Sequence, residues 1–160
     1  MDAGSFLSSV VEVAIGIAGF AGIVAAIRQR NVSSWPPRQL IQLQILFAAS
    51  AAAVVAGILP SFLAEAGVSE ALLWKVCSAT LISWLIGAIW YRARQGKRYG
   101  VGQPIPGMVM AWGMAAIVLQ AYNLAMPGVS WPYLFGVTGL LMNGFSAFLV
   151  LILRPFDDAD

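Results

Sequence analysis

Long runs of apolar residues, separated by short polar gaps, make up most of this chain. Five such segments can be drawn, at 6–27, 40–66, 70–91, 107–126 and 132–153. Each is about 20 residues or longer, the length that an α-helix needs to cross the hydrocarbon core of a bilayer. The pattern predicts an all-α integral membrane protein, a bundle of five transmembrane helices that forms one domain over residues 1–160.

The basic residues divide unequally between the gaps and predict an orientation. Of the nine Lys and Arg residues, all but Lys75 lie in the first gap, in the third gap or after the fifth segment: Arg28, Arg30, Arg38, Arg92, Arg94, Lys97, Arg98 and Arg154. Cytoplasmic loops of membrane proteins accumulate Lys and Arg. The distribution therefore predicts an N-terminus outside and a C-terminus in the cytoplasm, with a disordered acidic tail at 155–160.

Composition agrees with a membrane protein, since 60% of the residues are hydrophobic and only 10% are charged. A soluble domain carries about a quarter charged residues. The net charge is +2, with −3 on the predicted outer side and +5 on the predicted inner side. No basic soluble module that could read nucleic acid is apparent, so the lipid bilayer is the expected partner. In general character the chain resembles small bacterial inner-membrane proteins. This resemblance implies the cytoplasmic (inner) membrane as its location and assigns no functional residues.

Small and polar residues share one side of four predicted helices. Small residues let membrane helices approach closely, and isolated polar side chains then bond across the contact. These faces therefore predict either the interior of the bundle or an interface between subunits. They comprise Ser8, Glu12, Gly16, Gly19 and Ala26 in the first segment, Gln42, Ala49, Ala53, Gly57 and Pro60 in the second, Gly113, Ala116, Gln120 and Asn123 in the fourth, and Gly136, Gly139, Asn143 and Ser146 in the fifth.

Two ionisable residues lie inside predicted spans. Glu12 and Lys75 are each about five residues from the outer end of a segment, which places both about 7–8 Å below the outer interface. Gln120 and Asn123 come at a similar depth. Because a charge inside a bilayer is costly, these four residues are predicted to form a polar cluster in the outer third of the membrane. In the alternative interpretation, Lys75 reaches up to the headgroups and Glu12 sits at a frayed helix end.

Two further residues interrupt the apolar pattern. Asn143 lies near the middle of the fifth segment, where an unpaired amide is costly. It could bond to another helix, bond to its own copy across a symmetry axis, or line a pore. Pro60 is expected to kink the second helix and to free the backbone carbonyl of Ala56.

Residue types that carry common chemistry are missing from the sequence. There is no His, the single Cys is Cys77, and every Asp lies near a terminus. Usual haem ligands, serine triads, paired aspartates and metal-binding spacings are therefore not found. We expect neither an enzyme nor a protein that binds a cofactor or a metal.

Two classes of function remain open. The first is a small oligomeric membrane channel or transport protein, in which copies share a path lined by the small and polar faces. The second is a non-catalytic accessory or scaffold subunit of a larger membrane protein complex. A channel needs a polar stripe that reaches the inner mouth, yet the first segment is apolar from Ile15 to Ile27 and the fifth is apolar after Ser146. These apolar stretches would have to act as a hydrophobic gate, or they argue against a pore.

Overall fold

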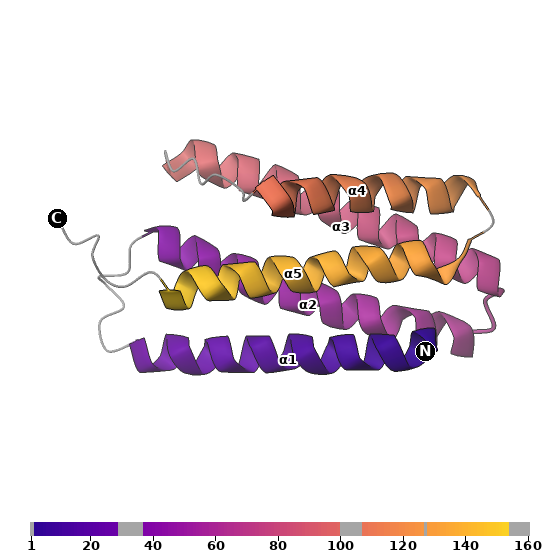
Figure 1. The fold of residues 1–160 in the computed structure, drawn as a ribbon, viewed down its shortest axis with the longest axis horizontal. Coiled ribbons are helices and arrows are strands. Elements are labelled where there is room, and N and C mark those ends of the chain that lie inside the picture. Colours follow the sequence, from indigo (N-terminus) through magenta and orange to yellow (C-terminus); the bar gives the residue numbers. More distant parts are fainter. Residues whose placement is uncertain (1, 29–36, 100–106, 127, 154–160) are drawn as a thin grey trace.

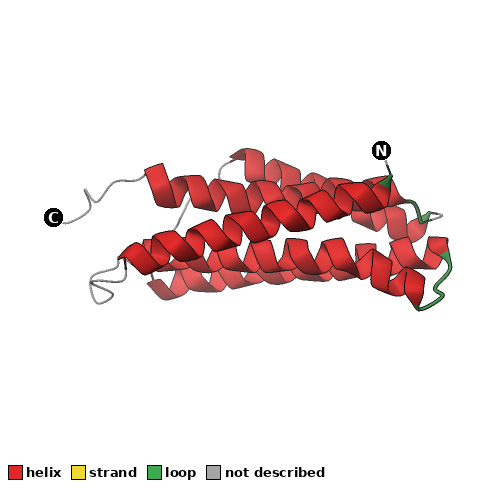
Figure 2. Cartoon of the chain, turned by 90° about the horizontal axis from the view of Figure 1, so that it is seen from below, coloured by secondary structure: helices red, strands yellow, loops and turns green. Residues whose placement is uncertain are grey.

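The computed structural model describes residues 2–28, 37–99, 107–126 and 128–153, and these residues are helical except for short turns (Figures 1 and 2). The predicted acidic tail, most of the first gap and residues 100–106 of the third gap lie outside the described residues. The all-α class is confirmed for the part that is described. The helices are α1 (Ala3–Arg28), α2 (Pro37–Glu65), α3 (Glu70–Tyr99), α4 (Gly107–Ala125) and α5 (Ser130–Leu153).

Four of the helices, α1, α2, α3 and α5, are long and apolar enough to cross a membrane. Helix α4 has 19 residues, and its apolar part, Met110–Ala125, is shorter than the other four spans. The helical lengths and composition therefore support a membrane-embedded bundle. A fifth crossing by α4 stays a prediction.

Helix α5 occupies the centre of the bundle, because it contacts each of the other four helices. Around it, α1, α2, α3 and α4 follow one another in chain order, each packing on the next. Within the described residues, α1 makes no contact with α3 or α4. In Figure 1, α4, α5 and α1 form the nearer layer, and α3 and α2 lie behind them. The centre of the bundle is therefore filled by α5, which occupies the place that a transport path along the axis of a single chain would need.

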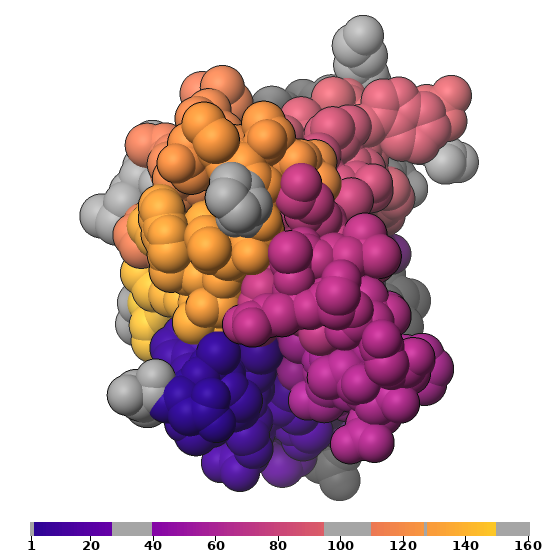
Figure 3. All heavy atoms as spheres, turned by 90° about the vertical axis from the view of Figure 1, so that its right-hand side faces the viewer, coloured from indigo at the N-terminus to yellow at the C-terminus, as the bar shows by residue number. Residues whose placement is uncertain are grey.

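Neighbouring helices along the chain run in opposite directions, so the bundle has two distinct ends. One end, seen face on in Figure 3, carries the start of α1, the α2–α3 turn and the α4–α5 connection. We call it the acidic end, after Asp2, Glu65 and Glu70. The opposite end, where α1, α3 and α5 finish, carries Arg92 and Arg94 and is called the basic end.

The α2–α3 turn has the geometry of a helix cap centred on Gly67. Its φ of 77° lies in the left-handed region that glycine adopts without strain. The Gly67 N–H donates to the Ala64 carbonyl and the Val68 N–H donates to the Leu63 carbonyl, at 3.0 and 3.1 Å. These two bonds form a Schellman motif, which satisfies carbonyls left over at the end of α2. The tight hairpin predicted around Gly67 is therefore present.

Helix α3 continues to Tyr99, about two turns beyond the predicted end of its segment at residue 91. The prediction located the end of the apolar run, whereas the helix continues through Gly96 to Tyr99. Arg and Lys are good helix formers in water, so a loss of hydrophobicity does not end a helix. Because of this extension, Arg92 lies on a helix and not in a loop.

Candidate functional site

Asn123 is the centre of a closed polar network at the acidic end. Its side chain is fully buried, with 0% exposed. The amide nitrogen donates to the Ser78 hydroxyl at 2.8 Å and to the Val129 carbonyl at 3.0 Å, and the amide oxygen accepts from the Val129 N–H at 2.9 Å. One side chain thus joins α3, α4 and the α4–α5 connection. This is a structural role, because every bond of the network is internal.

Gln120 and Lys75 lie at the same end of the bundle. Gln120 is fully buried, and its side-chain nitrogen donates to the carbonyl of Pro132 at the start of α5. Lys75 is half-buried, and its Cγ would lie 3.1 Å from a Cβ added at Gly128. The aliphatic stem of Lys75 therefore packs on the connection that Asn123 fixes. Three members of the predicted cluster are brought to one region.

Glu12 is not brought to that region. It is exposed on α1, and α1 packs only on α2 and α5 among the described residues. Helix α5 stands between α1 and α4, and α2 stands between α1 and α3, so no partner on α3 or α4 is within reach. In the described part of the chain, no basic side chain forms a salt bridge with Glu12.

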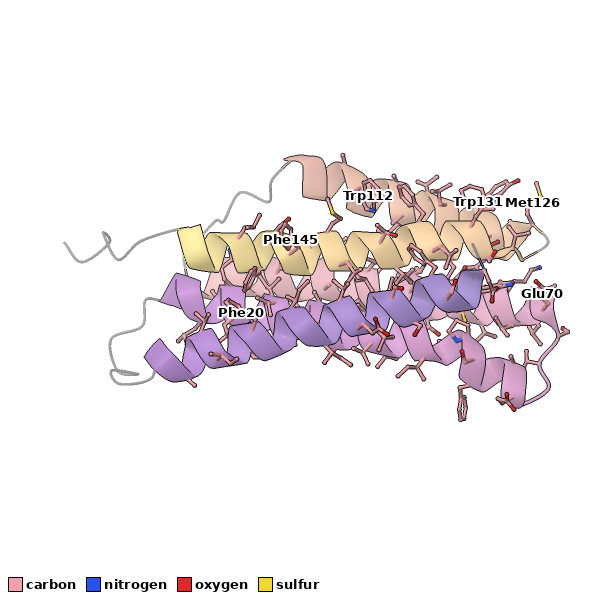
Figure 4. All side chains as sticks on the ribbon, turned by 60° about the horizontal axis from the view of Figure 1, so that its bottom comes forward. Phe20, Glu70, Trp112, Met126, Trp131 and Phe145 are labelled. Atoms are coloured by element: carbon pink, nitrogen blue, oxygen red, sulfur yellow. The ribbon has the colours of Figure 1, made fainter. Side chains whose placement is uncertain are left out.

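Three of the four small and polar faces point into the bundle, except that a Cβ added at Gly113 of the α4 face would meet no atom within 4 Å. Gly57 approaches α1, since an added Cβ would overlap Val11. Gly139 leaves room for the ring of Trp112 on α4, which Figure 4 labels. The Trp112 ring also stacks on Phe135, with 4.3 Å between centroids. The other predicted packing residues on these helices are buried as well, namely Ala49, Ala53 and Gly136.

The face of α1 points outward instead. Gly16 and Gly19 are exposed, and no atom lies within 4 Å of a Cβ added at either glycine. They were predicted to pack helices together, but within one chain they pack on nothing. We define the outer face of α1 as the exposed residues Ser5, Ser8, Glu12, Gly16, Gly19, Ile23 and Ala26, which share one side of the helix.

Glu12 is also further from the start of its helix than from the start of the predicted segment. Helix α1 begins at Ala3, so Glu12 is nine residues into the helix, about 14 Å from its start. The predicted frayed end is therefore not observed, because regular helix continues for about two and a half turns before Glu12 and also beyond it. An exposed carboxylate this far along an apolar helix calls for a partner outside the chain or for water.

The backbone carbonyl that Pro60 leaves without a helical donor is hydrogen-bonded by a residue of α5. Proline has no N–H, so the carbonyl of Ala56 loses its usual helical donor. The Tyr133 hydroxyl donates to that carbonyl at 2.7 Å, and Tyr133 is 1% exposed. Sequence reasoning found the free carbonyl but missed Tyr133, whose position in the first turn of α5 gave no signal of this contact. The Ala56 carbonyl is therefore already hydrogen-bonded within the chain.

Asn143 bonds to another helix, which was one of the three predicted alternatives. Its amide oxygen accepts from Nη2 of Arg92 on α3 at 2.9 Å. Both residues line a pocket of about 420 Å³ between α2, α3 and α5 in the basic half of the bundle. Arg92 was assigned to a loop by the sequence, and the continuation of α3 is what places it here.

Comparison of the chain with protein-family models, curated proteins and solved structures finds no match. The function is therefore inferred from the side chains of the described residues. Among the described residues, no group of three or more His, Cys, Asp or Glu could hold a metal ion. Among the described residues, two places combine polar or charged side chains with exposure: the outer face of α1, which carries Glu12, and the pocket beside Arg92.

Proposed function

We propose that the protein is a small oligomeric membrane channel or transport protein, whose copies associate through the outer face of α1. One observation carries the proposal: Glu12 is exposed on a membrane-type helix, between serines and glycines, while the comparable faces of α2, α4 and α5 are turned inward. A carboxylate facing lipid is costly, and membrane carboxylates face a bundle interior or a water-filled cavity.

A second copy of the chain is the occupant that this face fits best. Gly16 and Gly19 would let two α1 helices approach closely, and Ser8 could bond across the contact. Helix α5 fills the centre of each single chain, so a path has to lie between copies. Copies of α1 around an axis would form a ring of Glu12 carboxylates, and such rings select for cations.

Orientation follows from the positive-inside rule, with the acidic end outside and the basic end in the cytoplasm of a bacterial cell. Glu12 then lies in the outer half of the membrane. Towards the basic end, the outer face of α1 continues with the exposed residues Ile23 and Ala26. In a closed ring, Ile23 would form a hydrophobic constriction that gates by dewetting. No catalytic step is assigned to the chain.

The second candidate function is an accessory or scaffold subunit of a larger membrane complex. The observation that favours it is that no polar side chain follows Glu12 on the outer face of α1, so this face lacks a continuous polar path to the basic end. In that case the face would bind a helix of another protein, and Glu12 would bond to a polar group of that helix.

Cation flux into proteoliposomes tests the first candidate against the second. Wild-type protein should conduct a monovalent cation, and Glu12→Gln should lose most of that flux because the charged ring is removed. The matched control is Glu65→Gln, an exposed carboxylate at the α2–α3 turn, which should conduct like the wild type. Absence of flux from the wild type, together with a fixed set of other membrane proteins bound to it in native membranes, would favour the accessory subunit.

A further inference from the structure

The pocket beside Arg92 is a positively charged recess with no described counter-ion. Its polar lining comes from α2, α3 and α5 and comprises Gln44, Ser83, Tyr91, Arg92 and Asn143. Small residues such as Ala48 and Gly87 leave the space open. Arg92 is only partly exposed. No carboxylate of the described residues forms a salt bridge with it, since Asp2, Glu12, Glu65 and Glu70 all lie in the acidic half or at the acidic end.

Hydrogen-bond donors outnumber acceptors in this pocket. The amide oxygen of Asn143 is taken by Arg92, and the amide oxygen of Gln44 accepts from the Tyr91 hydroxyl at 3.0 Å. Each amide therefore offers its NH₂ group, and the guanidinium has five N–H donors, of which one bond to the described residues is made. A charged recess lined by donors suits an anion, and guanidinium groups bind phosphate in particular.

An apolar cavity adjoins the pocket on the side of the acidic end, and we call it the groove past Trp84. Trp84 lines both the pocket and a second cavity of about 120 Å³ between α2, α3 and α5, whose other lining residues include Val55 and Leu81. The exposed side chains of Gln44, Trp84 and Tyr91 show that the pocket opens on the outer surface of the bundle. A ligand could thus place an anionic group at Arg92 and an acyl chain along the groove.

The depth of the pocket agrees with a lipid headgroup. Arg92 lies two residues before the end of the apolar span Glu70–Arg94, and Gln44 lies four residues after the start of the span Leu40–Glu65. Nearby, the Arg94 guanidinium lies 4.3 Å from the centre of the exposed Trp90 ring, an arrangement suited to the interfacial layer. Basic pockets between membrane helices bind anionic headgroups.

We propose that this pocket binds the phosphate group of an anionic phospholipid, held by Arg92, Asn143 and Gln44, with an acyl chain in the groove past Trp84. The site is built from α2, α3 and α5 and includes no residue of the outer face of α1. The lipid site and the proposed transport function can therefore be tested independently, and failure of one proposal would leave the other unaffected.

Native mass spectrometry of delipidated protein in an uncharged detergent tests the site. After addition of equal amounts of phosphatidylglycerol and phosphatidylcholine, wild-type protein should retain phosphatidylglycerol preferentially. Arg92→Gln should lower that retention about tenfold, the effect of losing one charge-assisted contact. The matched control is Arg94→Gln, which removes the same charge two residues away and should retain lipid like the wild type. Equal loss in both variants, or equal retention of the two lipids by the wild type, would overturn the proposal.

A second variant keeps the site testable if Arg92→Gln does not fold. Gly87 lines the pocket, and no atom lies within 4 Å of a Cβ added there, so Gly87→Leu should fold normally and fill the pocket without changing any charge. It should reduce phosphatidylglycerol retention, whereas Gly113→Leu, at another open glycine position, should not. A Gly87→Leu variant that retains lipid fully would contradict the site.

Inorganic phosphate distinguishes a lipid from a soluble ligand. The thermal unfolding temperature of the delipidated protein should rise with phosphatidylglycerol and should not change with millimolar phosphate alone. A rise with phosphate that depends on Arg92, together with none from the lipid, would overturn the assignment to a phospholipid.

Discussion

Asn123 and Glu12 are both polar residues of helices in a membrane-type bundle, and their surroundings are opposite. Asn123 is fully buried and makes three hydrogen bonds with α3 and the α4–α5 connection. Glu12 is exposed on α1, and in the described part of the chain it has no ion-pair partner. A polar group whose bonds are complete holds the bundle together. A polar group that the fold leaves open needs something from outside the chain.

The largest loss of stability is expected from Asn123→Leu. The substitution removes the Asn123 partner of the buried Ser78 hydroxyl and of the partly buried backbone groups of Val129, and it should cost about 2–3 kcal/mol of unfolding free energy. Reversible unfolding in mixed detergent micelles measures the difference. Tyr122→Phe, at an exposed position of the same helix, serves as the control. Equal stabilities of the two variants would show that the network is not structural.

A smaller loss is expected at a glycine that packs inside the chain. Gly57→Ala should destabilise the protein by about 1–2 kcal/mol, because the added Cβ would overlap Val11 and crowd the Leu7 carbonyl. Gly19→Ala on the outer face of α1 should cause no such loss, since its Cβ would meet open space. The pair is compared by the same unfolding assay in detergent, where copies of the chain are separated. A loss at Gly19 equal to that at Gly57 would mean that the α1 face is packed within the chain.

The contact between Tyr133 and Ala56 should contribute about 1 kcal/mol, as one buried hydrogen bond. Tyr133→Phe removes it. In a Pro60→Ala background the backbone N–H of residue 60 is restored and can bond to the Ala56 carbonyl, so the cost of Tyr133→Phe should become smaller. A double-mutant cycle measures this coupling. Additive effects of the two substitutions would mean that Tyr133 does not replace the donor lost at Pro60.

The smallest effect on stability is expected from Glu12→Gln. In separated chains the side chain contacts no charged partner among the described residues, so the change should stay within about 0.5 kcal/mol. The same substitution is predicted to abolish most cation flux. A large loss of stability in the separated chain would show that Glu12 is bonded internally.

The helices were predictable because hydrophobic length is set by the bilayer, and the α2–α3 turn was predictable because Gly67 is a helix-capping residue. The direction of the small and polar faces was not. Lipid is as apolar as a helix interface, so Gly16 on α1 and Gly57 on α2 look alike in sequence although one is exposed and the other buried. The pocket at Arg92 was missed for another reason. Hydropathy locates the edge of the membrane, whereas α3 continues past that edge to Tyr99.

Assembly through α1 is tested most directly by the mass of the particle in lipid nanodiscs, measured by native mass spectrometry. The wild type should form a closed ring of identical copies, as should the control Gly113→Leu. Gly19→Leu should give smaller particles, because its bulk projects from the outer face of α1 without disturbing the fold of the chain. A monomeric wild type, or an unchanged ring from Gly19→Leu, would contradict assembly of the protein through this face.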